Sequence, residues 1–384
     1  MNIIQIPFKG KTSVVMIVAP VGAYDEANEY KGISHFLEHM HFKGSAKRTQ
    51  KQISYDIEKV GGDINAFTDW ELTVYWAKVS NQYLGIAKDV ISDMVLYPKL
   101  PKSEINKERN VIIQELEMYE DNPKYYVDDL FNQEMYSKES GFYLPIIGTK
   151  TTLKKINAEN LRQYHTALYN DLTMIVVGDV KEKHEYVNSN ELYCTALDQP
   201  SNRFSEKFVY KNVNQANVLI GGNIFVNDLN MNDIIVMSDI IESIYGDMYG
   251  RLFQKIREEK GLVYGINFDT ALYENGLLEW RVSLGLKSSK VKEAHSAIIK
   301  ELVRPYTKGD LEFALTKTIG NIELCQSSIS NVANIVAYAI ARNIDYKKLL
   351  NNYVPDVKRL VHKVNDLRER LNFSENLMVG ILPK

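Results

Sequence analysis

Apolar residues recur along the chain with two different periods, and these periods predict alternating strands and helices. Thr12 to Ala19 is rich in β-branched residues, which predicts a buried strand. From Gly32 to Met40 the apolar residues recur at spacings of three and four, which is the period of a helix. The helical period returns from Gln50 to Val60, and two extended segments rich in Thr, Val, Tyr and Trp follow between Ile64 and Val79.

The remaining chain continues this alternation and then repeats it. We expect helices at Leu84 to Leu96, Lys102 to Tyr119 and Tyr125 to Met135, and a strand at Leu172 to Val177. The stretch from Asp198 to Lys207 is polar and without a clear period. After it we expect a strand at Ala216 to Gly221, helices at Asp233 to Ile244 and Arg251 to Lys260, strands at Val263 to Thr270 and Leu277 to Leu286, and helices near Ser289 to Val303 and Leu311 to Ile340.

The repeated order predicts an α+β protein with two similar α/β domains. We place the first at residues 1–197, a linker at 198–207 and the second at 208–384. No clear repeat of individual residues accompanies the repeated order of elements. The length of 384 residues agrees with two or three domains at about 150 residues each.

Composition and charge exclude several classes of protein. Apolar residues make up 45% and charged residues 25%, as in folded soluble proteins. The formal net charge of −3, from 46 basic and 49 acidic side chains, argues against a nucleic-acid binder. The apolar run around Val14 to Val21 is far shorter than the ~20 residues that span a bilayer. Since the opening residues also lack a signal-peptide pattern, we expect a cytoplasmic protein without a membrane partner.

Two histidines four residues apart, in the segment His35-Phe36-Leu37-Glu38-His39, are the strongest chemical signal. On a helix both imidazoles project from one face, which suits two positions of a tetrahedral Zn²⁺ site. Glu38 lies beside the pair, where its carboxylate can take a proton from water activated by the metal. His-x-x-Glu-His is the inverted zinc-protease motif. The alternative is a chance spacing on a charged helix, which is not rare in a chain with 7 histidines.

A catalytic zinc site needs a third protein ligand, and a later helix offers carboxylates. Glu108 and Glu115 are seven residues apart and share a helix face, with Val111 and Ile112 between them marking the side we expect to be buried. A carboxylate at the edge of a buried face is unfavourable unless it is paired or bound to a metal. A solvated acidic helix is the alternative, and it fits Glu117 and Glu120 better.

The segment Gly32-Ile33-Ser34-His35-Phe36-Leu37-Glu38-His39-Met40-His41-Phe42-Lys43-Gly44 closely resembles the signature of the pitrilysin family of zinc metallopeptidases. The likeness is closest to the short-chain branch that includes the mitochondrial processing peptidases. This resemblance implies that the third ligand is the glutamate 76 residues beyond His39, which is Glu115, and that Glu108 supports the site. It also implies one Zn²⁺ per chain, and a fold of two α/β sandwich domains that forms half of a clam-shaped chamber.

The resemblance extends to two further segments. Gly61-Gly62-Asp63-Ile64-Asn65-Ala66-Phe67-Thr68-Asp69 resembles the family's edge strand, to which a substrate peptide adds as a further strand, and this implies substrate contacts at Asn65, Ala66 and Phe67. Arg251 to Tyr264 resembles the signature of the family's second domain. There Arg257 and Tyr264, seven residues apart, match an arginine and a tyrosine that reach the zinc site and stabilise the oxyanion.

The other histidines and the cysteines are expected to be structural. His41 lies two residues after His39 and about 200° around the helix, so it should not join the same metal. His165, His184, His295 and His362 have no partners at ligand spacing, and the two cysteines, Cys194 and Cys325, are expected to be buried small apolar residues.

The sequence therefore predicts a zinc metalloendopeptidase that hydrolyses short or unfolded peptides within a closed chamber, and the resemblance implies a homodimer. The alternative is a non-catalytic peptide-binding or assembly subunit of a peptidase complex that keeps its zinc for structure. Glu38, Arg257 and Tyr264 weigh against that alternative because a structural subunit has no use for them.

Overall fold

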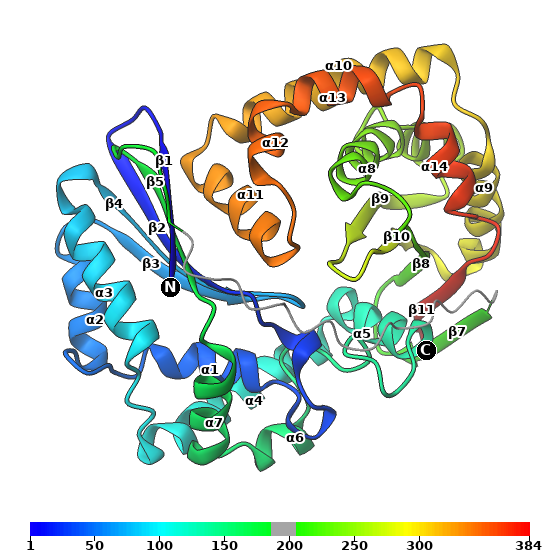
Figure 1. Cartoon of the computed structure of the whole chain (residues 1–384). Helices are drawn as coiled ribbons and strands as arrows, with labels where there is room; N and C mark the ends of the chain where they lie inside the picture. The colour runs from blue at the N-terminus through cyan, green and yellow to red at the C-terminus, as the bar shows by residue number, and fades with distance from the viewer. Residues whose placement is uncertain (186–204) are drawn as a thin grey trace. The chain divides into compact units, whose positions relative to one another are not determined.

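The computed structural model describes residues 1–185 and 205–384, and these residues form two compact units (Figure 1). The first unit comprises Met1–Met118, the described part of residues 144–196, and Cys325–Tyr346. The second comprises Tyr119–Tyr143, the described part of residues 197–324, and Lys347–Lys384. Each unit is therefore built from separate stretches of the chain. Most of the predicted linker, 198–207, lies outside the described residues, and its last three residues begin a strand.

A six-stranded sheet in the order β3-β4-β2-β5-β1-β6 forms the centre of the first unit. All described neighbours in it are antiparallel except β1 and β5, so β3 lies at one edge and pairs with β4 alone. Helix α3 packs on β2 and β4, and α11 packs on β2 and β5. The unit contains β1 (Asn2–Pro7), β2 (Thr12–Ala19), β3 (Asp63–Thr68), β4 (Thr73–Ser80), β5 (Thr173–Gly178), β6 (Lys183–Glu185), α1 (Ile33–His41), α2 (Gln50–Glu58), α3 (Leu84–Leu96), α6 (Lys150–Lys155), α7 (Ala158–Leu168), α11 (Ile329–Ala341) and most of α4 (Lys102–Asp121).

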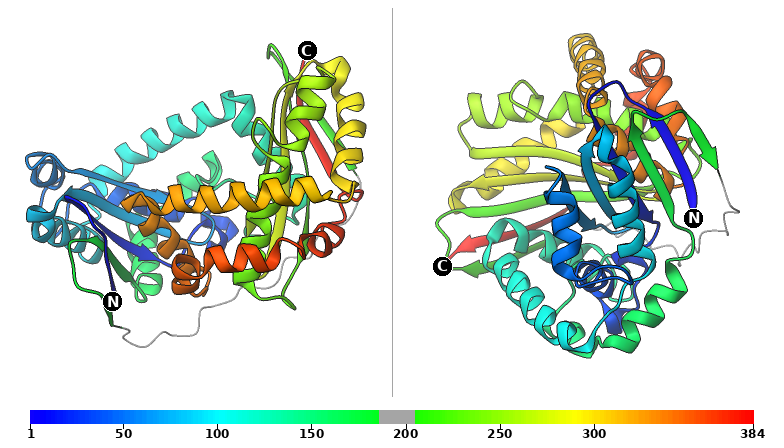
Figure 2. Two further views of the ribbon diagram at one scale, coloured as in Figure 1. Left: turned by 90° about the horizontal axis from the view of Figure 1, so that it is seen from above. Right: turned by 90° about the vertical axis from the view of Figure 1, so that its left-hand side faces the viewer.

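The second unit has a five-stranded sheet in the order β7-β11-β8-β10-β9. Only β7 and β11 run parallel, and Figure 2 shows the two side by side near the C-terminus. Helix α5 packs on β8 and β11, and α8 packs on β9. The unit contains α5 (Pro123–Met135), β7 (Ser205–Lys211), β8 (Ala216–Phe225), α8 (Met231–Tyr245), a π-helix (Phe253–Glu259), β9 (Val263–Leu272), β10 (Leu277–Leu286), α9 (Val291–Val303), most of α10 (Lys308–Gln326) and of α12 (Tyr346–Asn351), α13 (Tyr353–Leu360), α14 (Val364–Arg370) and β11 (Leu377–Pro383).

The fold class predicted from the sequence is confirmed: helices flank two mostly antiparallel sheets. The long helix expected from Leu311 to Ile340 is instead broken into α10 and α11. Ser328 ends the continuity because its side chain accepts a hydrogen bond from the Asn331 amide and caps the start of α11. No helix within the described residues is long and apolar enough to cross a membrane.

A buried carboxyl group in the second unit couples the stability of the fold to pH. Glu242 of α8 accepts hydrogen bonds from the backbone amide and the hydroxyl of Thr270 on β9, at 2.7 and 2.5 Å. Burial, reinforced by the nearby carboxyl of Asp239, raises the pKa of Glu242 from 4.5 to about 7 despite these hydrogen bonds. Because the folded-state pKa is raised, the stability from this group is complete below pH 4.5 and is lost as the pH rises through about 7.

We predict that Glu242→Gln removes this pH dependence, since glutamine keeps the acceptor oxygen and does not ionise. Between pH 4.5 and pH 8 the native protein should lose up to about 3 kcal/mol more stability than the variant, at about 1.4 kcal/mol per pKa unit. Urea unfolding at both pH values measures the difference, with Glu312→Gln, an exposed position on α10, as control. Parallel pH profiles for the native protein and Glu242→Gln would contradict this assignment.

Candidate metal centre

Helix α1 carries the histidine pair, and a buried carboxylate fixes its first turn. The carboxylate of Glu26 accepts hydrogen bonds from the backbone amides of Gly32 and Ser34, each at 2.7 Å. Such a carboxylate satisfies the free amides of a helix start and complements the positive end of the helix dipole. Gly32 has a φ of 94°, and a Cβ there would lie 2.5 Å from the carbonyl oxygen of Ile147, so only glycine fits. The start of α1 is therefore set by local contacts.

The side chains of His35, His39 and Glu115 converge on one point of the first unit. Glu115 Oε1 lies 4.0 Å from His35 Nε2, and Glu115 Oε2 lies 3.6 Å from His39 Nε2. The two imidazole rings meet edge to face with their centroids 4.6 Å apart. One ligand atom from each of the three residues lies within 4.8 Å of the others, and no other such group occurs in the described residues. His39 and Glu115, which are 76 residues apart in the sequence, are thus in contact in the structure.

This donor set fits a zinc ion. Bonds of about 2.0 Å in a tetrahedron bring ligand atoms to about 3.3 Å from one another, close to the separations found here. Burial, and the neighbouring His39, lower the pKa of His35 to about 3, so its ring is neutral near pH 7 and keeps a lone pair for a metal. Three protein donors of this kind leave a fourth position of a tetrahedron open, which is the pattern of catalytic zinc sites.

Glu108 and Lys43 orient His39 from the side away from the convergence point. Glu108 Oε1 lies 2.9 Å from His39 Nδ1, and Lys43 Nζ lies 2.6 Å from Glu108 Oε2. The pKa of Glu108 is lowered because its hydrogen bonds to His39 and Lys43 outweigh the effect of burial. The ionised carboxylate holds the proton of His39 on Nδ1 and directs Nε2 towards Glu115. The pKa of His39 is correspondingly raised, because Glu108, Glu38 and Glu115 outweigh its burial.

Glu38, the predicted general base, lies on the same helix and is almost fully buried. Burial raises the pKa of this carboxyl group, although a hydrogen bond from Thr68 and the proximity of His39 act in the opposite direction. Thr68 Oγ1 donates that hydrogen bond to Glu38 Oε2 at 2.6 Å. A raised pKa makes the carboxylate of Glu38 a stronger proton acceptor, which is what a general base requires.

Strand β3 presents a free edge in the same unit. The Asp69 amide donates a hydrogen bond to the carbonyl of Leu72, so the backbone groups of Asp69 point towards the chain that continues into β4. In an antiparallel pair the backbone groups of successive residues point alternately towards and away from the partner strand, so those of Ala66 and Thr68 point outwards from the edge of the sheet. Asn65 is exposed, and its Oδ1 accepts a hydrogen bond from the amide of Ala66 at 2.8 Å. Phe67 stacks on Tyr338 of α11, with ring centroids 6.4 Å apart. The three predicted substrate contacts thus share one edge strand, and binding of a peptide by Ala66 requires the side chain of Asn65 to turn away.

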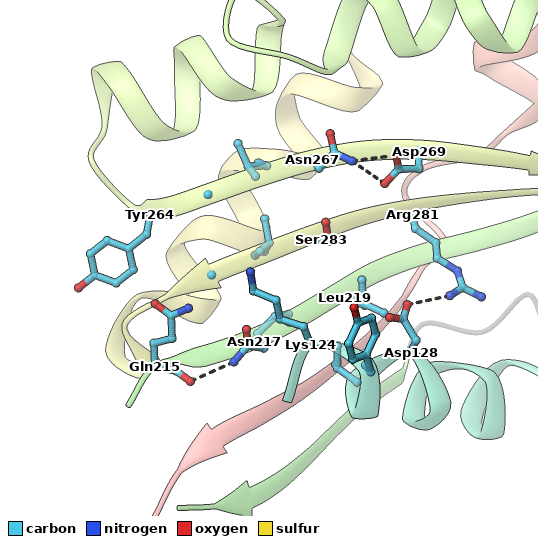
Figure 3. A pocket seen from close by; sticks show the side chains of 17 residues that line it. Lys124, Asp128, Gln215, Asn217, Leu219, Tyr264, Asn267, Asp269, Arg281 and Ser283 are labelled. Carbon is cyan, nitrogen blue, oxygen red and sulfur yellow. Dashed lines mark hydrogen bonds and ion pairs between the residues drawn. The ribbon is translucent and has the colours of Figure 1, made fainter. Parts of the chain in front are cut away.

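Arg257 and Tyr264 belong to the second unit. Arg257 lies in the π-helix, a geometry common at functional sites, with its guanidinium 4.5 Å from the ring centroid of Phe253. Tyr264 is 56% exposed at the start of β9 and lies at one end of a groove of about 680 Å³ (Figure 3). The other end of this groove carries the charged side chains of Asp128, Asp269 and Arg281. The approach of Arg257 and Tyr264 to the metal ligands stays a prediction.

Val111 differs from what the sequence led us to expect, whereas His41 is structural, as expected. Val111 was expected on the buried side of α4 and is 47% exposed, because the buried positions follow Ile105, Ile112 and Leu116. His41 is fully buried: its Nδ1 lies 2.7 Å from the Leu37 carbonyl and its ring stacks on Tyr169.

The two cysteines were both expected to be buried, and the structure describes only one of them. Cys325 is only partly buried, because it lies near the end of α10. Cys194 lies outside the described residues.

Two residues of the site were not recognised in the sequence. Lys43 follows His39 by four residues, a spacing that places it next to His39 if the helix is extended by one turn. Thr68 stands in the edge-strand segment, but its contact with Glu38 depends on how β3 packs on α1.

Two mixed α/β units, and a helix that presents His-x-x-Glu-His towards a glutamate, are features of an inverted-motif zinc peptidase. Residues 4–149 match the family described as insulinase (peptidase family M16), and residues 155–317 match the peptidase M16 inactive domain. The chain belongs to the M16 peptidase family, within which it resembles the branch of the mitochondrial processing peptidases.

Individual relatives agree with this membership. An uncharacterized zinc protease of Rickettsia felis is 30% identical over 84% of this chain and 77% of its own length. The uncharacterized zinc protease YmxG of Bacillus subtilis is 34% identical over 67% of this chain, which spans 64% of that relative. A probable mitochondrial-processing peptidase subunit beta of Arabidopsis thaliana is 34% identical over 46% of this chain and 33% of its own length.

A solved structure shows the same fold. The crystal structure of a protease from Helicobacter pylori has a TM-score of 0.88 and 18% identity, covering 99% of this chain and 97% of its own.

We predict that Glu108→Gln weakens zinc binding at least tenfold, since the uncharged amide supports His39 less well and leaves Lys43 without its carboxylate. Competition with a chelator of known affinity measures the change. Glu117→Gln is the matched control, because this exposed carboxylate of the same helix pairs only with the surface residue Lys150 among the ion pairs described. An unchanged zinc affinity in Glu108→Gln would contradict the supporting role of Glu108.

Proposed function

We propose that this chain is a zinc-dependent endopeptidase that cleaves short or unfolded peptides. The observation that carries the proposal is the convergence of three half-buried metal-type donors beside the carboxyl group of Glu38. Hydrolysis by metal-activated water requires a set of metal ligands and a nearby acid–base group, and the buried carboxyl group of Glu38 lies next to such a set. Membership of a family whose relatives are named zinc proteases supports the same reading.

In this proposal His35, His39 and Glu115 hold one zinc ion per chain. When bound, the ion supplies a Lewis acid that polarises the scissile carbonyl and makes water acidic near neutral pH. Glu38 accepts the proton of the attacking water on its carboxylate and delivers it to the nitrogen of the leaving amine. Glu108 keeps His39 in one tautomer throughout, because its carboxylate retains the proton on Nδ1.

The substrate is proposed to bind as an extended strand along the free edge of β3. The outward amide and carbonyl of Ala66 pair with any peptide backbone, so sequence tolerance comes from the main chain and selectivity from side chains such as Phe67. Only a chain without its own strand partners can use this edge, which is why we infer short or unfolded substrates. Asn65 exchanges its contact with Ala66 for one with the substrate backbone.

Arg257 and Tyr264 are proposed to act on the reacting carbonyl. A guanidinium and a phenol are hydrogen-bond donors suited to an oxygen that gains negative charge in the transition state. The exposure of Tyr264 supports this role, since 56% of the residue is open to a ligand.

We predict that Glu38→Gln keeps its zinc and loses peptide cleavage by about 10² to 10⁴ fold, because glutamine cannot carry the proton. Zinc content by elemental analysis and cleavage of an unfolded protein are measured on the same sample. Full activity in Glu38→Gln would contradict the role of Glu38. Zinc and peptide binding without cleavage by the native protein would favour the alternative, a non-catalytic subunit.

We further propose that two copies of the chain pair to form the active species, because one relative is named as a subunit of a processing peptidase. Light scattering coupled to an activity assay should find cleavage at twice the chain mass of 44.1 kDa. Cleavage confined to a species of a single chain mass would contradict the homodimer.

A further inference from the structure

The hydroxyl of Thr68 is a direct partner of the predicted base. It donates to Glu38 Oε2 at 2.6 Å and leaves Oε1 for other contacts. A glutamate side chain has three rotatable bonds, so a single hydrogen bond from a rigid strand removes much of its freedom. Thr68 is the last residue of β3, the strand whose free edge is proposed to bind the substrate.

Alternation of side chains gives neighbouring residues of β3 different partners. Thr68 points to Glu38 of α1, whereas Phe67 points to Tyr338 of α11. The end of β3 therefore lies between these two helices, which are almost 300 residues apart in the sequence. Any shift of this strand end moves the Thr68 hydroxyl relative to Glu38.

The turn that follows Thr68 is fixed on one side by the loop before α1. The carbonyls of Asp69 and Trp70 accept hydrogen bonds from the amides of Ala23 and Tyr24, at 3.0 and 2.8 Å. Gly22 permits this close approach, because a Cβ there would lie 2.4 Å from the carbonyl oxygen of Asp69.

Helix α11 and the residue that follows it fix the same turn with two side chains, those of Tyr338 and Arg342, which are four residues apart. Tyr338 Oη donates to Asp69 Oδ2 at 2.7 Å, and Arg342 Nε donates to Glu71 Oε2 at 2.8 Å. The Arg342 and Glu71 side chains are only 19% and 8% exposed, so this ion pair is shielded from water and its loss is costly. Helix α11 lies outside both segments that match the family, at residues 4–149 and 155–317.

We propose that Thr68 is a positioning residue for Glu38, and that Tyr338 of α11 and Arg342, which follows the end of that helix, hold the turn that keeps Thr68 in place. The proposal rests on the function proposed above and assigns α11 a role in it. Tyr338 and Arg342 act through the 69–72 turn and Thr68, since their hydrogen bonds end on Asp69 and Glu71. The end of β3 that orients Glu38 also belongs to the edge that is proposed to bind the substrate. Strand β3 therefore positions both the general base and the peptide that it acts on.

The first experiment separates positioning from folding. Thr68→Val removes the hydroxyl at nearly constant volume and should lower kcat about 10- to 100-fold while KM and zinc content stay unchanged. Thr68→Ser restores the hydroxyl and should recover most of the native kcat. Native kcat in Thr68→Val, parallel losses of zinc or of substrate affinity, or no recovery in Thr68→Ser would each overturn the proposal.

The second experiment needs neither activity nor metal. In the zinc-free protein, Tyr338→Phe should increase amide hydrogen exchange about tenfold or more in residues 69–72 and leave the exchange of β5 unchanged. Tyr346→Phe is the matched control, because its hydroxyl bonds to His184 on β6 instead. Unchanged exchange in the 69–72 turn would overturn the role of α11, even if the protein proved not to be a peptidase. If exchange rises as expected and the native protein cleaves no peptide, only the proposed function fails.

Discussion

The convergence of three electron-pair donors on one half-buried point is the constraint on which the rest of the structure depends. His35 and His39 lie on α1 and Glu115 lies on α4, so a fold that brings their donor atoms together must hold both helices rigidly. That rigidity is visible at both helices. Glu26 fixes the start of α1, and the contact of Glu108 with Lys43 ties α4 to the end of the same helix. The three predicted metal ligands are thus the more exposed part of a larger set of buried polar contacts.

Helical periodicity and the residue spacing of a resembling family were the two features of the sequence that predicted this site. A separation of four residues sufficed for His35 and His39, because on a helix it fixes a common face. Glu115 followed from the resemblance and not from any local rule. The contact of Thr68 with Glu38 could not be foreseen, since it depends on how strand and helix pack. The strands and helices were mostly recognised, but α11 was hidden in one long apolar pattern that continued from α10.

The two units share an architecture and differ in chemistry. Each builds a mostly antiparallel sheet with helices against it, as the repeated order of elements in the sequence indicates. Only the first unit gathers metal-type donors among the described residues, whereas the second carries a groove with Tyr264 at one end. A common fold therefore does not imply a common function, because the function depends on the side chains that each sheet and its helices present.

The completion of the first unit by residues 325–346 has a consequence for synthesis on the ribosome. The three predicted metal ligands, on α1 and α4, leave the ribosome long before α11, at a stage when β2 and β5 of the sheet in the same unit still lack that covering helix. Contacts between residues so distant in sequence form late and slow the final stage of folding. The growing chain consequently exposes apolar sheet surface until residue 346 has emerged, which makes this stage the one at which chaperones would be needed most.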